Sequence, residues 1–195
     1  MQILKGITHF QVRSFTDLRD MIRQSAELFG EQVAFRFKET PKAPVETRTY
    51  RQFLTELEAL GTALTAHGLA GKRIAVIGEN SYYWCLAHAA VINGVGVVVP
   101  LDRLLPEDEV QGLLARADVS AVLYDGSFHQ VMQKAAAALP GIQRFVCIRS
   151  ATLKLPEGEE PFADPAEADT REGSAFLRLS DLASEGMRLL AAGRR

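Results

Sequence analysis

Short runs of β-branched residues alternate with helix-compatible sequence from residue 73 onward, and this alternation constrains the fold more than any other feature. The runs are RIAVIG, VGVVVP, SAVLYD and RFVCI, which begin at residues 73, 95, 120 and 144. Each is almost continuously apolar, as expected of strands that are buried on both faces of a sheet. Parallel strands need crossover connections, and the intervening helices supply them. The sequence therefore predicts a doubly wound α/β fold, with a mostly parallel sheet and helices on both faces.

Helices are predicted wherever apolar residues recur at three- and four-residue steps. Those between the strands cover residues 81–93, 106–117 and 128–139, and others cover 15–29, 50–67 and 180–193. An alternating segment at residues 33–37 predicts one more strand, which is half exposed, and residues 38–48 are predicted to form a loop.

Local signals mark the ends of several helices. Thr49 and Gln52 have the spacing of a capping box, in which Thr49 begins the helix. Gly68 is predicted to end that helix, and Gly30 to end the preceding one in a left-handed conformation. Ser180 is predicted to cap the last helix.

The composition changes after Ile148, and this change divides the chain. Residues 149–175 are rich in Glu, Pro and Ala and have almost no apolar period. We therefore expect an α/β amino-terminal subdomain over residues 1–150, a polar loop or excursion over 151–178 and a helix over 179–195.

Charge and composition exclude several classes of partner and location. The formal net charge is −2 and the basic residues are scattered, which argues against nucleic acid. No run of 18 apolar residues predicts a transmembrane segment, and the first residues lack the features of a secretory signal. Cys85 and Cys147 are predicted to be small buried side chains, which suits a reducing compartment. We therefore expect a cytoplasmic protein.

Polar residues follow the first two core strands at their carboxyl ends, where sheets of this type bind ligands. Residues 78–84 follow the first strand and residues 100–103 follow the second, so both groups are expected at one edge of the sheet. Asn80 and Trp84 are candidates for the rim of a cleft there. In the alternative interpretation, Asn80 or Ser81 caps the next helix and the aromatic residues pack over the sheet.

Arg103 is the candidate anion-binding residue at the same edge. A guanidinium in this position can make a bidentate contact with a phosphate or a carboxylate. The alternative is a surface ion pair with Asp102 or Glu107.

Other candidate sites lack the context that their chemistry requires. The acidic residues 107–109 follow Pro106 at a predicted helix start, so the helix dipole explains them better than a metal does. Gly94 and Gly96 precede a strand, whereas a dinucleotide-binding glycine motif follows one. We expect Gly94 to end a helix and Gly96 to allow close backbone approach. The four histidines have no metal-site spacing, and we assign no catalytic residue and no metal ligand to the chain.

Two stretches resemble a known family. They are RTYRQFLTELEALGTALTAHGLAGKRIAVIGEN, which starts at residue 48, and AAVINGVGVVVPLDRLLPEDEVQGLLARADVSAVLYD, which starts at residue 89. The first is similar to a Thr-Tyr pair before a Leu-rich helix, and the second to a small-Gly-x-x-x-x-Pro-hydrophobic motif at residues 94–101. Both resemble the amino-terminal part of AMP-forming acyl-CoA synthetases, in the adenylate-forming superfamily that also holds luciferases and nonribosomal peptide adenylation domains. The fatty-acyl branch is the most similar.

The resemblance implies an enzyme that uses ATP and Mg²⁺ to activate a fatty acid as an acyl-adenylate and then transfers the acyl group to CoA. It also implies that Arg103 approaches the CoA phosphates and that Asn80 and Trp84 lie on the substrate side. The family's phosphate loop, its adenylate-binding motifs and its catalytic lysine have no counterpart before Arg195. We therefore expect an amino-terminal fragment that binds no cofactor alone, is inactive alone and has the remainder of its own polypeptide as partner.

Two other classes of function stay open. A stand-alone, non-catalytic binding or interaction module predicts a polar outer surface and a monomer or homodimer, whereas a piece of an enzyme predicts an exposed apolar face. A nicotinamide-dependent oxidoreductase fits the alternation of strands and helices but lacks GxGxxG after the first strand.

Overall fold

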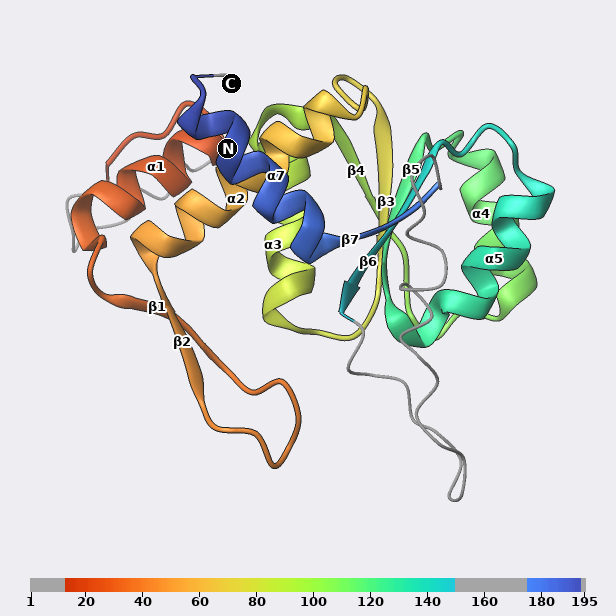
Figure 1. The fold of residues 1–195 in the computed structure, drawn as a ribbon, viewed down its shortest axis with the longest axis horizontal. Coiled ribbons are helices and arrows are strands. Elements are labelled where there is room, and N and C mark those ends of the chain that lie inside the picture. The colour runs from red at the N-terminus through yellow and green to blue at the C-terminus, as the bar shows by residue number, and fades with distance from the viewer. Residues whose placement is uncertain (1–12, 150–174, 194–195) are drawn as a thin grey trace, which may run out of the picture.

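A five-stranded parallel sheet forms the centre of the computed structural model, which describes residues 13–149 and 175–193 (Figure 1). The strands are β3 (Arg73–Ile77), β4 (Val97–Pro100), β5 (Ala121–Asp125), β6 (Arg144–Arg149) and β7 (Phe176–Arg178). They lie in the order β4-β3-β5-β6-β7, and every neighbouring pair is parallel. The predicted doubly wound α/β fold is therefore confirmed.

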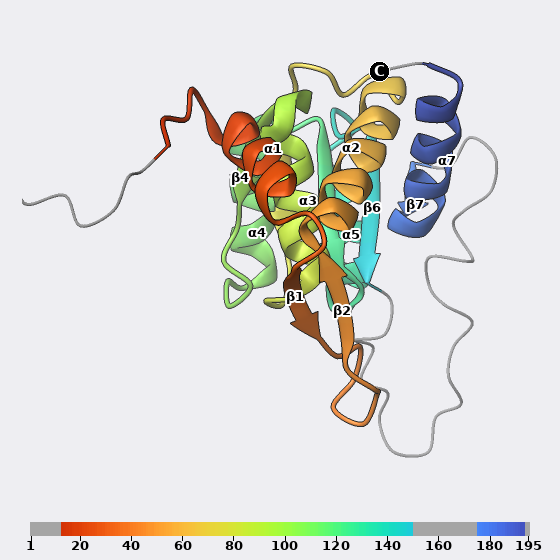
Figure 2. The same cartoon turned by 90° about the vertical axis from the view of Figure 1, so that its left-hand side faces the viewer.

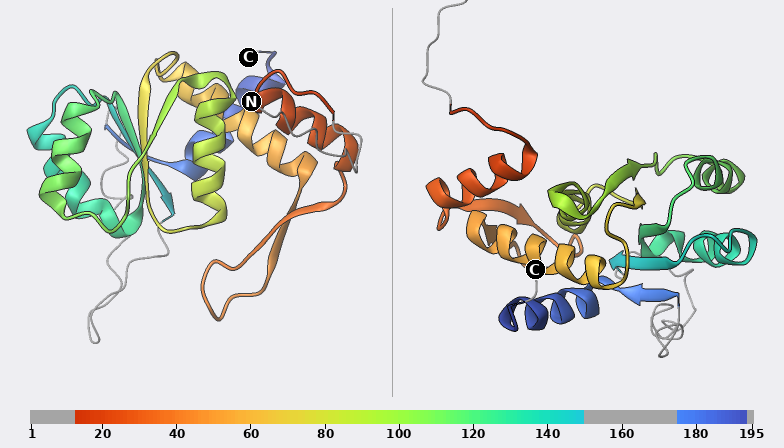
Figure 3. Two further views of the ribbon diagram at one scale, coloured as in Figure 1. Left: turned by 180° about the vertical axis from the view of Figure 1, so that it is seen from behind. Right: turned by 90° about the horizontal axis from the view of Figure 1, so that it is seen from above.

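Helices cover both faces of this sheet (Figure 3). One face carries α2 (Tyr50–Ala66), α3 (Tyr82–Ala90) and α7 (Leu179–Ala191), and the other carries α4 (Glu107–Arg116) and α5 (His129–Ala138). The side chains of β3 alternate between the two cores, since Ile74 and Val76 face the first while Ala75 and Ile77 face the second. All four are fully buried, which explains why the strand has no polar alternation.

An antiparallel hairpin precedes the core and extends past the carboxyl ends of the strands (Figure 2). It consists of β1 (Val33–Phe37) and β2 (Glu46–Thr49), and follows α1 (Leu18–Phe29). The hairpin leads directly into α2, whose capping box is confirmed. The Thr49 hydroxyl accepts a bond from the Gln52 amide at 3.2 Å, and the Gln52 side chain accepts one from the Thr49 amide at 2.9 Å.

Aromatic packing attaches the hairpin to α3. The ring of Tyr82 stacks on Phe37 with centroids 4.7 Å apart and meets Phe35 edge-on at 5.2 Å. The Arg48 guanidinium lies 5.5 Å from the centre of the Tyr82 ring, and its Nε donates to Glu56 at 2.9 Å. Burial lowers the pKa of Arg48, but the charge of Glu56 and other acidic neighbours outweighs it, so the pKa is raised overall.

Several local expectations are wrong. Gly30 has a right-handed backbone conformation, with φ −40° and ψ −49°, so α1 does not end in the predicted left-handed residue. A Cβ at Gly30 would lie 2.5 Å from the Arg51 guanidinium, so close approach explains this glycine. Ser180 does not cap α7, which begins at Leu179 directly after β7. Pro106 occupies the N-cap of α4 and lies one residue before the helix.

The sequence analysis also missed two strands. β2 occupies the end of the segment that was predicted as a loop, and β7 occupies the last three residues of the predicted polar excursion 151–178. The rest of that excursion up to residue 174 lies outside the described residues. Both strands are short and are defined by their pairing, β2 with β1 and β7 with β6.

Glycines explain the closest approaches in the fold. Gly94 and Gly68 have φ of +118° and +79°, and both end helical backbone, as expected. A Cβ at Gly96 would lie 2.2 Å from the Lys72 carbonyl oxygen, which confirms the predicted close approach. The tightest contact joins α7 to α2, where a Cβ at Gly186 would lie 1.8 Å from the Ala59 carbonyl oxygen.

This contact predicts that Gly186→Ala destabilises the protein. The added methyl forces α7 away from α2, and overpacking of this kind costs about 1–3 kcal/mol. Gly112→Ala is the matched control, because Gly112 lies inside α4 and its Cβ would meet nothing within 4 Å. We expect that control to stabilise the protein by roughly 0.5–1 kcal/mol through helix propensity. Urea unfolding of the two variants should give shifts of opposite sign, and equal shifts would contradict the tight crossing.

Candidate functional site

The carboxyl edge of the sheet is the candidate site, because the strand order reverses there. From β3 the chain moves outward to β4, returns past β3 to β5 and continues through β6 to β7. Loops that leave β3 and β5 therefore diverge at neighbouring positions, and sheets of this kind bind ligands in the crevice outside such a switch point. The hairpin β1–β2 extends from the same end of the molecule (Figure 1).

Arg103 lies at this edge and makes an ion pair with a residue that the sequence did not indicate. Its Nη1 lies 2.8 Å from Oε1 of Glu79, which follows β3. The two partners considered earlier are engaged elsewhere: Asp102 accepts a bond from the Leu104 amide at 2.9 Å, and Glu107 pairs with Lys134 at 2.6 Å. The Arg103 side chain is 43% exposed, so it remains accessible to an anion.

Asn80 and Trp84 differ in exposure. Asn80 is exposed directly after β3, whereas Trp84 is partly buried in α3 and packs against the first core. The Trp84 ring stacks on His88, with centroids 5.1 Å apart. Ser81 caps α3 through a bond from the Trp84 amide to its hydroxyl at 3.1 Å. Asn80 follows Glu79, the partner of Arg103, directly in the chain, whereas the Trp84 ring contacts His88 of the same helix; the assignment of both residues to the substrate side stays a prediction.

A buried ion pair lies at the neighbouring exits of β5 and β6. Asp125 is fully buried, and its Oδ2 lies 3.3 Å from Nη2 of Arg149, whose side chain is 13% exposed. The loop after β3 passes so close that a Cβ on Gly78 would lie 2.7 Å from Cβ of Asp125. The sequence analysis missed this pair, although a charged residue at the end of each apolar strand was the available signal.

Two tyrosines complete the polar groups at this edge. The Tyr82 hydroxyl donates to Glu56 at 2.8 Å, and the Tyr83 hydroxyl donates to Glu39 from the hairpin loop. Burial, together with the carboxylate that each hydroxyl contacts, raises the pKa of both tyrosines above the usual value. Both therefore remain neutral hydrogen-bond donors at physiological pH. A cavity of about 260 Å³ beside Tyr83 is also lined by Cys147, Arg149 and Arg178.

The described side chains of this edge include arginine guanidinium groups and tyrosine hydroxyls, which are positively charged groups and hydrogen-bond donors. No group of three His, Cys, Asp or Glu side chains in residues 13–149 and 175–193 could hold a metal ion. Burial raises the pKa of the Cys85 thiol, which disfavours its reactive thiolate form. Among the helices of the same ranges, none has the length and hydropathy that crossing a membrane requires. The edge can therefore bind anions and polar groups.

The two ion pairs of this edge predict different effects of matched substitutions. Glu79→Gln removes an exposed pair and should change the free energy of unfolding by less than about 1 kcal/mol. Asp125→Asn removes a fully buried charge from its pair with Arg149 and should cost about 3 kcal/mol or more. Both changes replace a carboxylate by an amide of equal size, so denaturant unfolding compares burial alone. A cost for Glu79→Gln equal to that for Asp125→Asn would refute this account.

Comparison with known proteins gives a family match over most of the chain. The model of the AMP-binding enzyme family matches residues 22–183. Surfactin synthase subunit 3 from Bacillus subtilis (strain 168) is 27% identical over 143 residues, which are 70% of this chain and 11% of that protein. Human long-chain-fatty-acid–CoA ligase 6 is 26% identical over 144 residues, which are 71% of this chain and 19% of that protein.

Solved structures share the fold. The A-PCP didomain of carboxylic acid reductase from Segniliparus rugosus, in complex with AMP, has a TM-score of 0.69 at 19% identity, and covers 90% of this chain and 27% of its own. A protein described as a long-chain-fatty-acid CoA ligase from Rhodopseudomonas palustris has a TM-score of 0.64 at 22% identity, with coverages of 86% and 36%. The chain thus spans between about a tenth and about a third of the length of these relatives. Because the family match covers well over half of the chain, the chain belongs to the AMP-binding family of adenylate-forming enzymes.

Proposed function

We propose that this chain is the amino-terminal part of an ATP-dependent, AMP-forming acyl-CoA synthetase that acts on a fatty acid. The family match over residues 22–183 carries the proposal, and the likeness to human long-chain-fatty-acid–CoA ligase 6 supports the acyl class. In this reaction the carboxylate attacks the α-phosphate of ATP, which releases pyrophosphate and leaves an acyl-adenylate. The CoA thiol then takes the acyl group and releases AMP. We also propose that it acts in the cytoplasm, in keeping with its two free cysteines.

The described residues fit a supporting role in that reaction. Arg103 meets the requirement for a contact to the CoA phosphates, because its side chain is accessible and its ion pair with Glu79 lies at the protein surface. Asn80, which follows Glu79 in the chain, is exposed and is proposed as a polar rim residue. Mg²⁺, when bound with ATP, neutralises phosphate charge. We assign it no ligand here, because Asp125 already pairs with Arg149 and the other carboxylates of the edge also have partners.

An exposed apolar row supports the proposal that the remainder of the polypeptide packs against this subdomain. Large apolar side chains that are 37% to 53% exposed follow one another along α1 and its flanks. They are Phe15, Leu18, Met21, Leu28, Phe29 and Val33. Contiguous exposed apolar surface marks a place where another protein surface docks. A stand-alone interaction module, the alternative function, predicts a polar surface here.

The proposed fragment role predicts that the chain alone forms no acyl-adenylate. The purified chain should catalyse no exchange of labelled pyrophosphate into ATP with any fatty acid, because it holds no lysine-bearing phosphate loop. A full-length acyl-CoA synthetase under the same conditions is the positive control. Exchange above background by the chain alone would overturn the proposed fragment role.

Binding of a hydrophobic dye distinguishes a piece of an enzyme from a stand-alone interaction module. The chain should bind a hydrophobic dye such as ANS, and Leu18→Gln combined with Met21→Gln should reduce the fluorescence at least twofold. Leu104→Gln is the matched control, because Leu104 is 75% exposed but lies outside the row on α1. Absence of dye binding, or an equal loss with the control, would favour the stand-alone module.

A further inference from the structure

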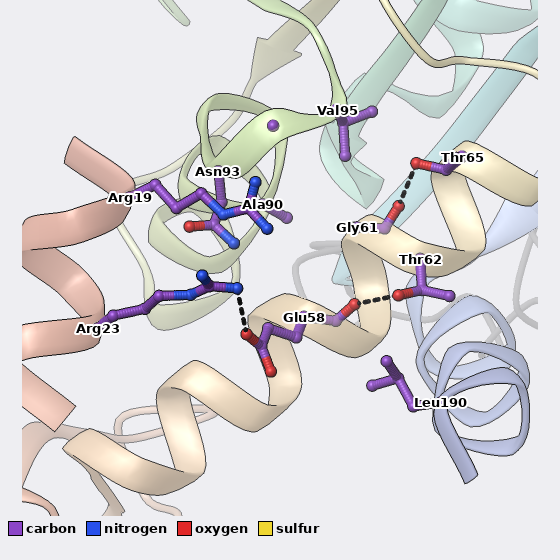
Figure 4. Close-up of a pocket in the computed structure, with 11 residues that line it drawn as sticks. Arg19, Arg23, Glu58, Gly61, Thr62, Thr65, Ala90, Asn93, Val95 and Leu190 are labelled. Atoms are coloured by element: carbon purple, nitrogen blue, oxygen red, sulfur yellow. Dashed lines mark hydrogen bonds and ion pairs between the residues drawn. The ribbon is translucent and has the colours of Figure 1, made fainter. Parts of the chain in front are cut away.

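A second cavity lies between α1, α2 and the turn that follows α3, away from the carboxyl edge (Figure 4). Its volume is about 280 Å³. The turn is η1 (Val91–Val95). Its Val95 carbonyl accepts a hydrogen bond at 2.6 Å from the amide of Gly71, which lies just before the amino-terminal end of β3. The cavity is therefore at the opposite end of the sheet from Arg103 and belongs to no site described above.

Two arginines of α1 face this cavity, and only one of them is neutralised by a protein group. Nη2 of Arg23 lies 3.4 Å from Oε1 of Glu58 on α2. Arg19, one turn earlier, also lines the cavity but makes no hydrogen bond or ion pair within the described ranges. Among the described residues of the lining these three are ionisable, so their summed formal charge is positive and Arg19 carries the excess. An anion is the complementary ligand.

Asn93 supplies a buried acceptor without a partner. The residue is only 9% exposed, and its Oδ1 has no hydrogen bond to the described part of the protein. Figure 4 shows its amide directed into the cavity, between the guanidinium groups of Arg19 and Arg23. A buried acceptor that is left unpaired is costly, which is why such groups usually have a partner. A ligand that donates a hydrogen bond to this oxygen removes that cost.

The backbone of η1 places Asn93 beside the arginines of α1. The helical backbone kinks at Gly94, whose φ of +118° lies in a region that favours glycine. A Cβ at Gly94 would lie 3.2 Å from Nη1 of Arg19, so the glycine also gives the guanidinium room beside the turn.

The two requirements together define the ligand. It must be an anion for Arg19 and must carry a hydrogen-bond donor for Oδ1 of Asn93. A carboxylate is an acceptor only, and so is a fully ionised sulfate, whereas a singly protonated phosphate has both properties. We propose that this cavity binds a phosphate group that keeps at least one proton. The group is either free phosphate or the head of a small phosphomonoester, whose organic part would contact Val95 and Leu190.

Calorimetric titration of the chain at pH 6 tests this site, with inorganic phosphate as the probe and sulfate as the comparison. We expect phosphate to saturate with a Kd of about 1 mM or tighter, and sulfate to bind at least tenfold more weakly because it lacks the donated hydrogen bond. Phenyl phosphate distinguishes the two sources. Tighter binding than inorganic phosphate identifies a phosphomonoester, and equal binding identifies the free ion.

Three variants make the result specific to the cavity. Arg19→Gln should weaken phosphate binding at least tenfold, whereas Arg36→Gln, which removes an exposed charge on β1, should leave it unchanged. Asn93→Leu should abolish the preference for phosphate over sulfate while keeping the fold, as checked by circular dichroism. Failure of phosphate to bind, equal binding of sulfate, or an Arg19→Gln affinity equal to that of the parent would each overturn the proposal. None of these outcomes depends on adenylate formation, so this test is independent of the proposed function.

Discussion

Burial of the parallel strands on both faces is the constraint on which the rest of the structure depends. β3 shows it most clearly, because Ile74 and Val76 fill one core while Ala75 and Ile77 fill the other. A strand of this kind needs a layer of helices on each side, and right-handed crossovers can provide both only if the chain changes direction within the sheet. The order β4-β3-β5-β6-β7 is the result, with α3 on one face and α4 and α5 on the other.

Because the strands are buried on both faces, polar and charged side chains lie at the ends of the strands. Since the strand interiors have no room for unpaired charge, the polar groups gather where β3, β5 and β6 leave the sheet. Asp125 is buried there with Arg149, while Glu79 pairs with Arg103 in solvent. The buried pair joins the ends of β5 and β6. Loss of the exposed pair, in which an anion would replace Glu79 as the partner of Arg103, would cost little stability. On the proposed function, Arg103 would contact the anionic ligand, whereas Arg149 pairs with the buried carboxylate of Asp125.

Sequence could predict features that depend on local chemistry. The capping box of Thr49 and Gln52 and the alternation of strands and helices involve residues that are close along the chain, and the structure confirms both. Predictions failed where a distant residue decides the outcome. The Gly30 carbonyl accepts a bond from the Arg51 amide at 3.0 Å, and the residues of β7 form a strand because β6 offers them a pairing edge. The pair of Asp125 and Arg149 was missed for the same reason, since 24 residues separate its members.

Helix α3 connects the two ends of the sheet, and this bears on how the proposed phosphate cavity relates to the carboxyl edge. The helix begins at Ser81 beside Glu79 and continues into η1, which carries Asn93. Coupling between the two ends would require α3 to have two alternative arrangements. Its inner face is packed too closely for that, because Leu86, Ala87 and Ala90 are between 0% and 2% exposed in the first core. A phosphate in the cavity would therefore stabilise η1 and α1 without altering the edge at Arg103. The proposed phosphate site and the proposed anion contact at Arg103 are therefore expected to bind their ligands independently.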